Sequence, residues 1–154
     1  IGLFWQGDSK NYKLDYQRSI ELNKFKSILK LKNINFISLQ KNYGSEEIKN
    51  NNFQNLISDY SLSIDKIPFE DTLAIIDNLD LVICVDSGIG HIAATLGKET
   101  WILLPQIPHY VWGLSENKSM WYSSVKLFRQ KKPNSWDEII KELRNNLIKK
   151  YSLD

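Results

Sequence analysis

The chain has 154 residues, of which 42% are hydrophobic, which suits one domain with a buried core. Its net charge of +2 is spread along the sequence, so bulk charge points to neither a nucleic acid nor a membrane surface. One cysteine and two histidines exclude an internal disulfide and argue against a structural zinc site.

No apolar run is long enough to span a membrane, and no signal peptide is present, from which we expect a cytoplasmic protein. The sequence begins on Ile1, without an initiator methionine, and enters a strand at once. We therefore expect residues 1–154 to be a single domain that is a fragment of a longer chain.

The first half of the chain alternates short apolar runs with helical patterns. Residues 1–5 predict a strand, and hydrophobic residues from Arg18 onward recur at three- and four-residue intervals, which predicts a helix capped by Ser19. A second strand over 35–40 and a short helix from Ser45 follow.

The next three predicted elements are a brief strand over 56–59, a helix over 69–79 and a strand over 81–85. The last of these is an unbroken apolar run rich in β-branched residues. Such a run is typical of a strand that is buried on both faces of a parallel sheet.

The most informative stretch follows this strand. Ser87 is a good N-cap and Gly97 a natural helix stop, which predicts a helix directly after the strand. Gly88 and Gly90 fall in its first turn, where backbone N–H groups lack intrahelical partners and no side chain blocks an anion. We therefore predict a phosphate site at this turn. The alternative is that the glycines only let the helix pack closely on the strand.

Two strands, over 100–104 and 125–129, and an amphipathic helix from Ser135 complete the predicted elements. The long loop between the strands carries several aromatic residues. We expect Trp121 to pack into the core, and we leave open whether Trp112 forms a lip of a ligand cleft.

Strands that alternate with helices in this way predict a Rossmann-like α/β fold, a parallel sheet with helices on both faces. Ligands of such sheets bind outside the carboxyl ends of the strands. No GxGxxG follows the first strand and no GxxxxGK[ST] occurs, so a dinucleotide-dependent dehydrogenase and a P-loop NTPase both fit poorly.

Several short motifs occur in an order that resembles one enzyme family. They are Trp5-Gln6-Gly7, Arg18-Ser19-Ile20, Ser38-Leu39-Gln40, the run from Asn78 to Lys98, Leu103-Leu104-Pro105, Trp121-Tyr122 and Leu127-Phe128-Arg129-Gln130. Over nearly the whole chain they resemble the nucleotide-binding half of bacterial ADP-heptose:LPS heptosyltransferases. They are still more similar to the glycosyltransferase-like domains that follow tetratricopeptide repeats.

This resemblance implies the C-terminal half of a GT-B glycosyltransferase, which binds a nucleotide-sugar donor as its substrate and needs no metal or other cofactor. An N-terminal acceptor lobe, with any helical repeats, is expected before Ile1 and is expected to supply the catalytic base. The catalytic residues therefore stay unknown, and we expect the fragment alone to bind its donor without turnover.

We predict that the donor diphosphate contacts residues near the ends of two strands, namely Gln6, Gly7, Lys10, Arg18, Ser87, Gly88, Ile89 and His91. A hydroxyl and helix-start amides hold phosphate without a cation, and Lys10 or Arg18 offsets the charge of the leaving group. Structural alternatives exist for some of them: N-capping for Ser87, a packed ring for His91 and a solvated face for the basic residues.

Contacts with the nucleobase, ribose or sugar are predicted for Gln40, Asp86 and Trp112. The alternative for Gln40 is a buried amide bonded to backbone, and for Asp86 a purely structural role in its turn.

Two other functions stay open at this point. A degenerate, non-catalytic lobe that serves as an interaction module is motivated by the weak charge at the predicted site and by the loop over 109–112. A GT-B-like epimerase acting on a nucleotide sugar is the other.

Overall fold

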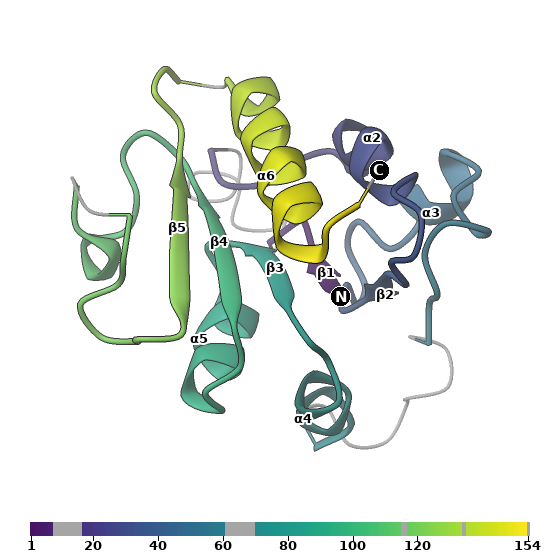
Figure 1. Cartoon of the computed structure of the whole chain (residues 1–154), viewed down its shortest axis with the longest axis horizontal. Helices are drawn as coiled ribbons and strands as arrows, with labels where there is room; N and C mark the ends of the chain where they lie inside the picture. Colours follow the sequence, from purple (N-terminus) through teal and green to yellow (C-terminus); the bar gives the residue numbers. More distant parts are fainter. Residues whose placement is uncertain (8–16, 61–69, 115–116, 134, 154) are drawn as a thin grey trace.

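The computed structural model describes residues 1–7, 17–60, 70–114, 117–133 and 135–153 (Figure 1). Five parallel strands form one sheet in the order β2-β1-β3-β4-β5. The strands are β1 (Gly2–Phe4), β2 (Ile37–Ser38), β3 (Val82–Val85), β4 (Thr100–Leu104) and β5 (Val125–Arg129). The predicted Rossmann-like parallel sheet is confirmed.

Helices connect and cover these strands. They are the 3₁₀ helix η2 (Leu22–Phe25), α2 (Lys26–Leu29), α3 (Glu47–Asn50), α4 (Glu70–Asp77), α5 (Gly88–Thr95), the 3₁₀ helix η4 (Tyr110–Trp112) and α6 (Trp136–Tyr151). Among the described residues, no helix combines the length and the apolar character that a membrane crossing requires.

The central strand β3 shows why the sheet has helices on both faces. Its alternate residues Ile83 and Val85 belong to one hydrophobic core, shared with η2, α2 and α6. Val82 and Cys84 belong to the other, shared with α4 and α5. All four side chains are fully buried, which explains the continuous apolar run in the sequence.

The helix predicted from Arg18 begins later, at Leu22, and Ser19 does not cap it. The Ser19 Oγ instead accepts a hydrogen bond from the Gly7 N–H, at 3.0 Å. The N–H of Leu22 donates to Glu47 Oε2 on α3, at 2.6 Å. The helix start is therefore capped by a carboxylate that is distant in the sequence.

The strand predicted over 56–59 was wrong in extent, because it is reduced to one parallel bridge between Ile37 and Ser58. The predicted strands over 100–104 and 125–129 are confirmed residue by residue. The predicted helix after Ser87 is also confirmed, and Gly97 follows its end with a φ of 72°, the left-handed conformation that glycine adopts easily.

The strand order creates a switch point between β1 and β3. The chain passes from β1 to β2 on one side, and from β3 to β4 and β5 on the other. Open α/β sheets bind ligands outside the carboxyl ends of the strands at such a point. The turns that follow Phe4 and Val85 meet here.

Candidate functional site

The turn after β3 contains a buried hydroxyl group without a normal partner. Ser87 has an extended backbone and is the N-cap residue of α5, but its side chain makes no capping hydrogen bond. Its Oγ is buried and lacks a regular hydrogen-bond partner among the described residues. Burial raises the pKa of the neighbouring Cys84 thiol, so this group stays protonated and offers only a weak contact. The Ser87 hydroxyl therefore keeps hydrogen-bonding capacity that the described residues do not use.

The two glycines in the first turn of α5 have different surroundings. A Cβ placed on Gly88 meets nothing within 4 Å, so the backbone there faces open space. A Cβ on Gly90 would lie 2.9 Å from Cys84 Sγ and 3.2 Å from Ile102 Cδ1. The packing role foreseen as an alternative therefore applies to Gly90, whereas the access that a phosphate needs exists at Gly88.

Arg18 connects the two sides of the switch point. Its Nη1 donates to the backbone oxygen of Asp86, at 3.2 Å. A guanidinium is permanently charged, so Arg18 brings a positive charge to the turn that contains Ser87. The other predicted cation, Lys10, lies outside the described residues.

The turn after β1 is held by the side chain of Gln40. Its Oε1 accepts hydrogen bonds from the N–H groups of Trp5 and Gln6, at 3.1 and 3.0 Å. Its Nε2 donates to the carbonyl oxygens of Gln6 and Tyr43, at 2.9 and 2.7 Å. These bonds use every donor and acceptor of an amide that is 2% exposed. Gln40 therefore has the structural role that the sequence left open as the alternative.

The neighbouring residues of this turn are also bonded within the domain. Gln6 Nε2 donates to Glu47 Oε1, and the Gly7 N–H donates to Ser19. Burial raises the pKa of the Glu47 carboxyl group, an effect that the hydrogen bond from the Leu22 N–H opposes. Gln6 and Gly7 thus belong to the turn next to the Ser87 turn, and these donors are already used by bonds inside the domain.

Asp86, Trp112 and His91 form a polar and aromatic network beside α5. Asp86 Oδ1 accepts a hydrogen bond from Trp112 Nε1, at 2.8 Å. The Trp112 ring is 2% exposed and stacks on His91, with ring centroids 4.8 Å apart. His91 Nδ1 lies 3.1 Å from the hydroxyl of Tyr122. In this structure Trp112 therefore packs inside the domain instead of lining an open cleft.

Two structural residues near the site were not identified from the sequence. Arg129 donates to the backbone carbonyls of Trp112 and Gly113 and so fixes the loop that carries Trp112. Glu47 joins the turn after β1 to the start of η2. Arg129 belongs to a motif that carried the family resemblance, whereas Glu47 gave no local signal, because its partners are distant in the sequence.

The expectation that Trp121 packs into the core was wrong, because this side chain is 69% exposed. The adjacent Tyr122 takes the inward position against His91. Within the described residues, no group of three or more histidine, cysteine or acidic side chains is arranged to hold a metal ion.

The comparison with protein families identifies the family of this chain. A model of glycosyltransferase family 9 (heptosyltransferase) matches residues 28–138, which is well over half of the chain and includes β2 to β5 and the Ser87 turn. No curated protein and no solved structure matches the chain significantly. Family 9 enzymes have the GT-B fold and use nucleotide-sugar donors, and a Rossmann-like parallel sheet is what that fold requires. The chain therefore belongs to glycosyltransferase family 9 (heptosyltransferase).

Proposed function

We propose that this domain is the donor-binding lobe of a family 9 glycosyltransferase and holds the donor diphosphate at the first turn of α5. The proposal rests on Ser87 and Gly88 at the switch point. Ser87 has a buried hydroxyl without a regular partner, and Gly88 leaves the backbone open to solvent. Both lie next to the charge of Arg18.

This arrangement suits the departure of a nucleoside diphosphate. As the bond between sugar and phosphate breaks, negative charge grows on the leaving oxygen and must be offset. The backbone N–H groups of Gly88 and Ile89 and the positive end of the α5 dipole can provide this, together with the Ser87 hydroxyl and Arg18. In this proposal protein groups carry out the stabilisation that a metal ion provides in other transferases.

The remaining predicted residues then have either a structural role or a possible contact with the donor. Asp86 and Gln40 hold the two turns in place through bonds inside the domain. His91 can still reach the donor through Nε2, since Tyr122 faces its Nδ1. The acceptor and the catalytic base would come from a second lobe, so this domain contributes donor binding and stabilisation of the leaving group.

Calorimetric titration of the chain with ADP-glucose, UDP-glucose and GDP-mannose tests the proposal. We expect saturable binding of at least one of them, competed by the matching nucleoside diphosphate. Gly88→Val should weaken this binding more than about tenfold, because the added side chain occupies the approach to the backbone donors. Ser87→Ala should weaken it by about three- to tenfold through the loss of one hydrogen bond.

Thr95→Val is a matched control, since it places the same side chain at the exposed far end of α5. It should leave the affinity unchanged. Circular dichroism should show that Gly88→Val folds normally, as the space around that Cβ is empty. Absence of binding by all three donors in a folded sample, or full affinity in Gly88→Val, would contradict the proposal.

A further inference from the structure

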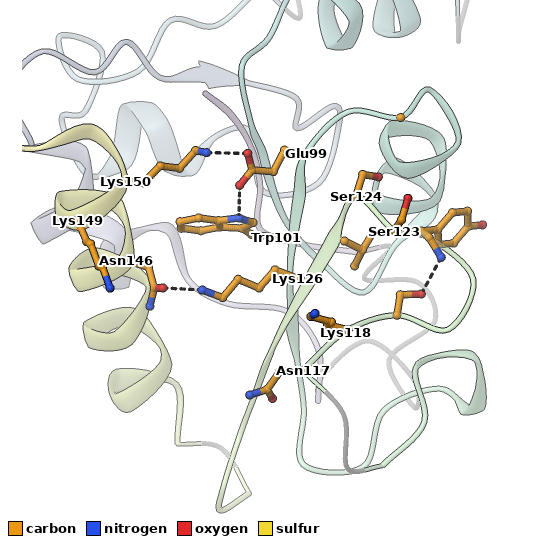
Figure 2. A pocket seen from close by; sticks show the side chains of 14 residues that line it. Glu99, Trp101, Asn117, Lys118, Ser123, Ser124, Lys126, Asn146, Lys149 and Lys150 are labelled. Carbon is orange, nitrogen blue, oxygen red and sulfur yellow. Dashed lines mark hydrogen bonds and ion pairs between the residues drawn. The ribbon is translucent and has the colours of Figure 1, made fainter.

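A cavity lined by several charged and polar side chains lies at the end of the strands opposite to the Ser87 turn. It has a volume of about 1010 Å³ and is formed by the amino ends of β4 and β5, the segment around 117–119 and the end of α6 (Figure 2). Glu99 and Ser124, which line it, directly precede β4 and β5. Because the strands are parallel, their amino ends lie away from the turns of the proposed donor site. We call this cavity the lysine groove.

The lysine groove concentrates positive charge from three separate elements. Its four basic side chains are Lys118 from the loop before β5, Lys126 from β5, and Lys149 and Lys150 from the last turn of α6. The acidic residue Glu99 is already engaged, because it accepts from Lys150 Nζ at 2.7 Å and from Trp101 Nε1 at 3.0 Å. The side chains of Lys118 and Lys149 make no ion pair or hydrogen bond within the described part of the chain.

The helix dipole explains only part of this charge. Basic residues in a last helical turn are stabilised by the helix carboxyl end, which accounts for Lys149 and Lys150. Lys118 and Lys126, however, form a bridged antiparallel pair between the loop and β5. Like charges placed opposite each other in this way destabilise a sheet unless an anion lies between or beside them.

Lys126 is also held in a fixed position, as Figure 2 shows. Its Nζ lies 5.3 Å from the ring centroid of Trp101 and 5.1 Å from that of Phe128. The same Nζ donates to Asn146 Oδ1 on α6, at 2.5 Å. An ammonium fixed in this way loses little side-chain entropy when a ligand binds.

Apart from Glu99, the other polar residues of the lysine groove are neutral. They carry hydroxyl or amide groups and are Asn117, Ser119, Tyr122, Ser123, Ser124 and Asn146. Ammonium groups bind phosphate oxygens, while hydroxyl and amide groups bind the hydroxyls of a sugar or a polyol. This combination fits a phosphate ester of a hydroxylated molecule better than a simple inorganic anion.

We propose that the lysine groove is a second anion site, which binds a phosphate group carried by a hydroxylated molecule. Soluble sugar phosphates and the phosphoglycerol headgroups of anionic lipids both have this chemistry. The four lysines that carry the proposal are not among the predicted donor-site residues, so it does not depend on the proposed function.

The test is a titration of the ¹⁵N-labelled chain with glucose 6-phosphate, followed by NMR, with glucose as the uncharged comparison. We expect saturable shifts of the backbone amides over 117–126 with glucose 6-phosphate, none with glucose, and weaker binding at high salt. The double variant Lys118→Gln/Lys149→Gln should lower the affinity at least about tenfold, through the loss of two charge-assisted contacts. The double variant Lys26→Gln/Lys141→Gln has the same net charge, alters two exposed lysines outside the groove, and should bind like the parent chain.

Sedimentation with vesicles of phosphatidylcholine, with and without phosphatidylglycerol, separates the two sources of phosphate. Binding to anionic vesicles that needs Lys118 and Lys149, with no saturable response to glucose 6-phosphate, would identify a lipid headgroup as the ligand. The converse would identify a soluble phosphate ester. The proposal is overturned if neither probe binds, if both double variants lose affinity equally, or if the shifts are confined to the Ser87 turn.

Discussion

The turns after β1 and β3 meet at the switch point and have similar small, polar sequences, but their polar groups are used differently. After β1, side chains from Gln40, Glu47 and Ser19 occupy the donors and acceptors of the turn. After β3, the Ser87 hydroxyl has no regular partner and Gly88 faces open space. The comparison teaches that small polar residues at a strand end keep groups free for a ligand only where the rest of the domain does not use them.

Removing the Gln40 amide should break the closed turn and have the largest effect on stability. Gln40→Leu leaves two backbone N–H groups and two carbonyls without their partners. We expect the free energy of unfolding in urea to fall by about 3 kcal/mol. Gln54→Leu, at an exposed position, is the control and should change it by less than about 0.5 kcal/mol. Equal effects of the two variants would show that the Gln40 bonds contribute little.

The same substitution at the two glycines of α5 should affect different properties, namely stability at Gly90 and donor binding at Gly88. Gly90→Val forces atoms into Cys84 and Ile102, so we expect a loss of about 2 kcal/mol in the free energy of unfolding. Gly88→Val meets no neighbour and should cost less than about 0.5 kcal/mol while it weakens donor binding. Thermal unfolding measured by circular dichroism separates the two. A similar loss in both variants would mean that the turn after β3 is closed as well.

Replacing Trp112 tests the part of the turn after β3 that is already hydrogen-bonded, because Asp86 accepts a hydrogen bond from Trp112. Trp112→Phe removes the indole N–H and leaves a buried carboxylate oxygen without its donor. We expect a loss of about 1.5 kcal/mol in the free energy of unfolding, measured by urea denaturation. Trp121→Phe makes the same chemical change on an exposed ring and should be nearly neutral. Equal losses would argue against the bond between Trp112 and Asp86.

The smallest expected effect is a pH dependence that arises from Glu47. Because burial raises the pKa of this carboxyl above its usual 4.5, the folded protein holds the proton more tightly than the unfolded chain. The stabilising contribution is therefore complete below about pH 4.5 and is lost as the pH rises through the raised folded value. In Glu47→Gln this part of the slope of unfolding free energy against pH should disappear. An unchanged slope would assign it to other groups.

The strands β4 and β5 and the helix α5 could be predicted because their signals are local. A strand with a continuous apolar run and a glycine after the helix end each specify conformation within a few residues, and Ser87 takes the N-cap position although its side chain makes no capping hydrogen bond. The start of η2 could not be predicted in this way. Its N–H partner is Glu47, and no local pattern near Leu22 indicates which distant carboxylate will reach it.

At the candidate site, the sequence predicted the location of the turn. It did not predict which of the two glycines packs against the sheet and which faces open space. Residues two positions apart in a helix point to nearly opposite sides, so one of Gly88 and Gly90 had to face the sheet. Which one does so depends on how α5 packs against Cys84 and Ile102. The lysine groove was also unpredictable, because Lys118, Lys126 and Lys149 line one groove only when β5 and α6 come together.

The pairing of β1 with β3 has a consequence for how the protein is made. Gly2 pairs with Val82 and Phe4 with Cys84, so β1 leaves the ribosome long before one of its two neighbours exists. During synthesis it can pair with β2, while its other edge waits for residues 82–85. A nascent chain that stalls before that point exposes an unpaired strand edge, which is a template for aggregation. Translation speed between β2 and β3 should therefore influence the yield of folded protein.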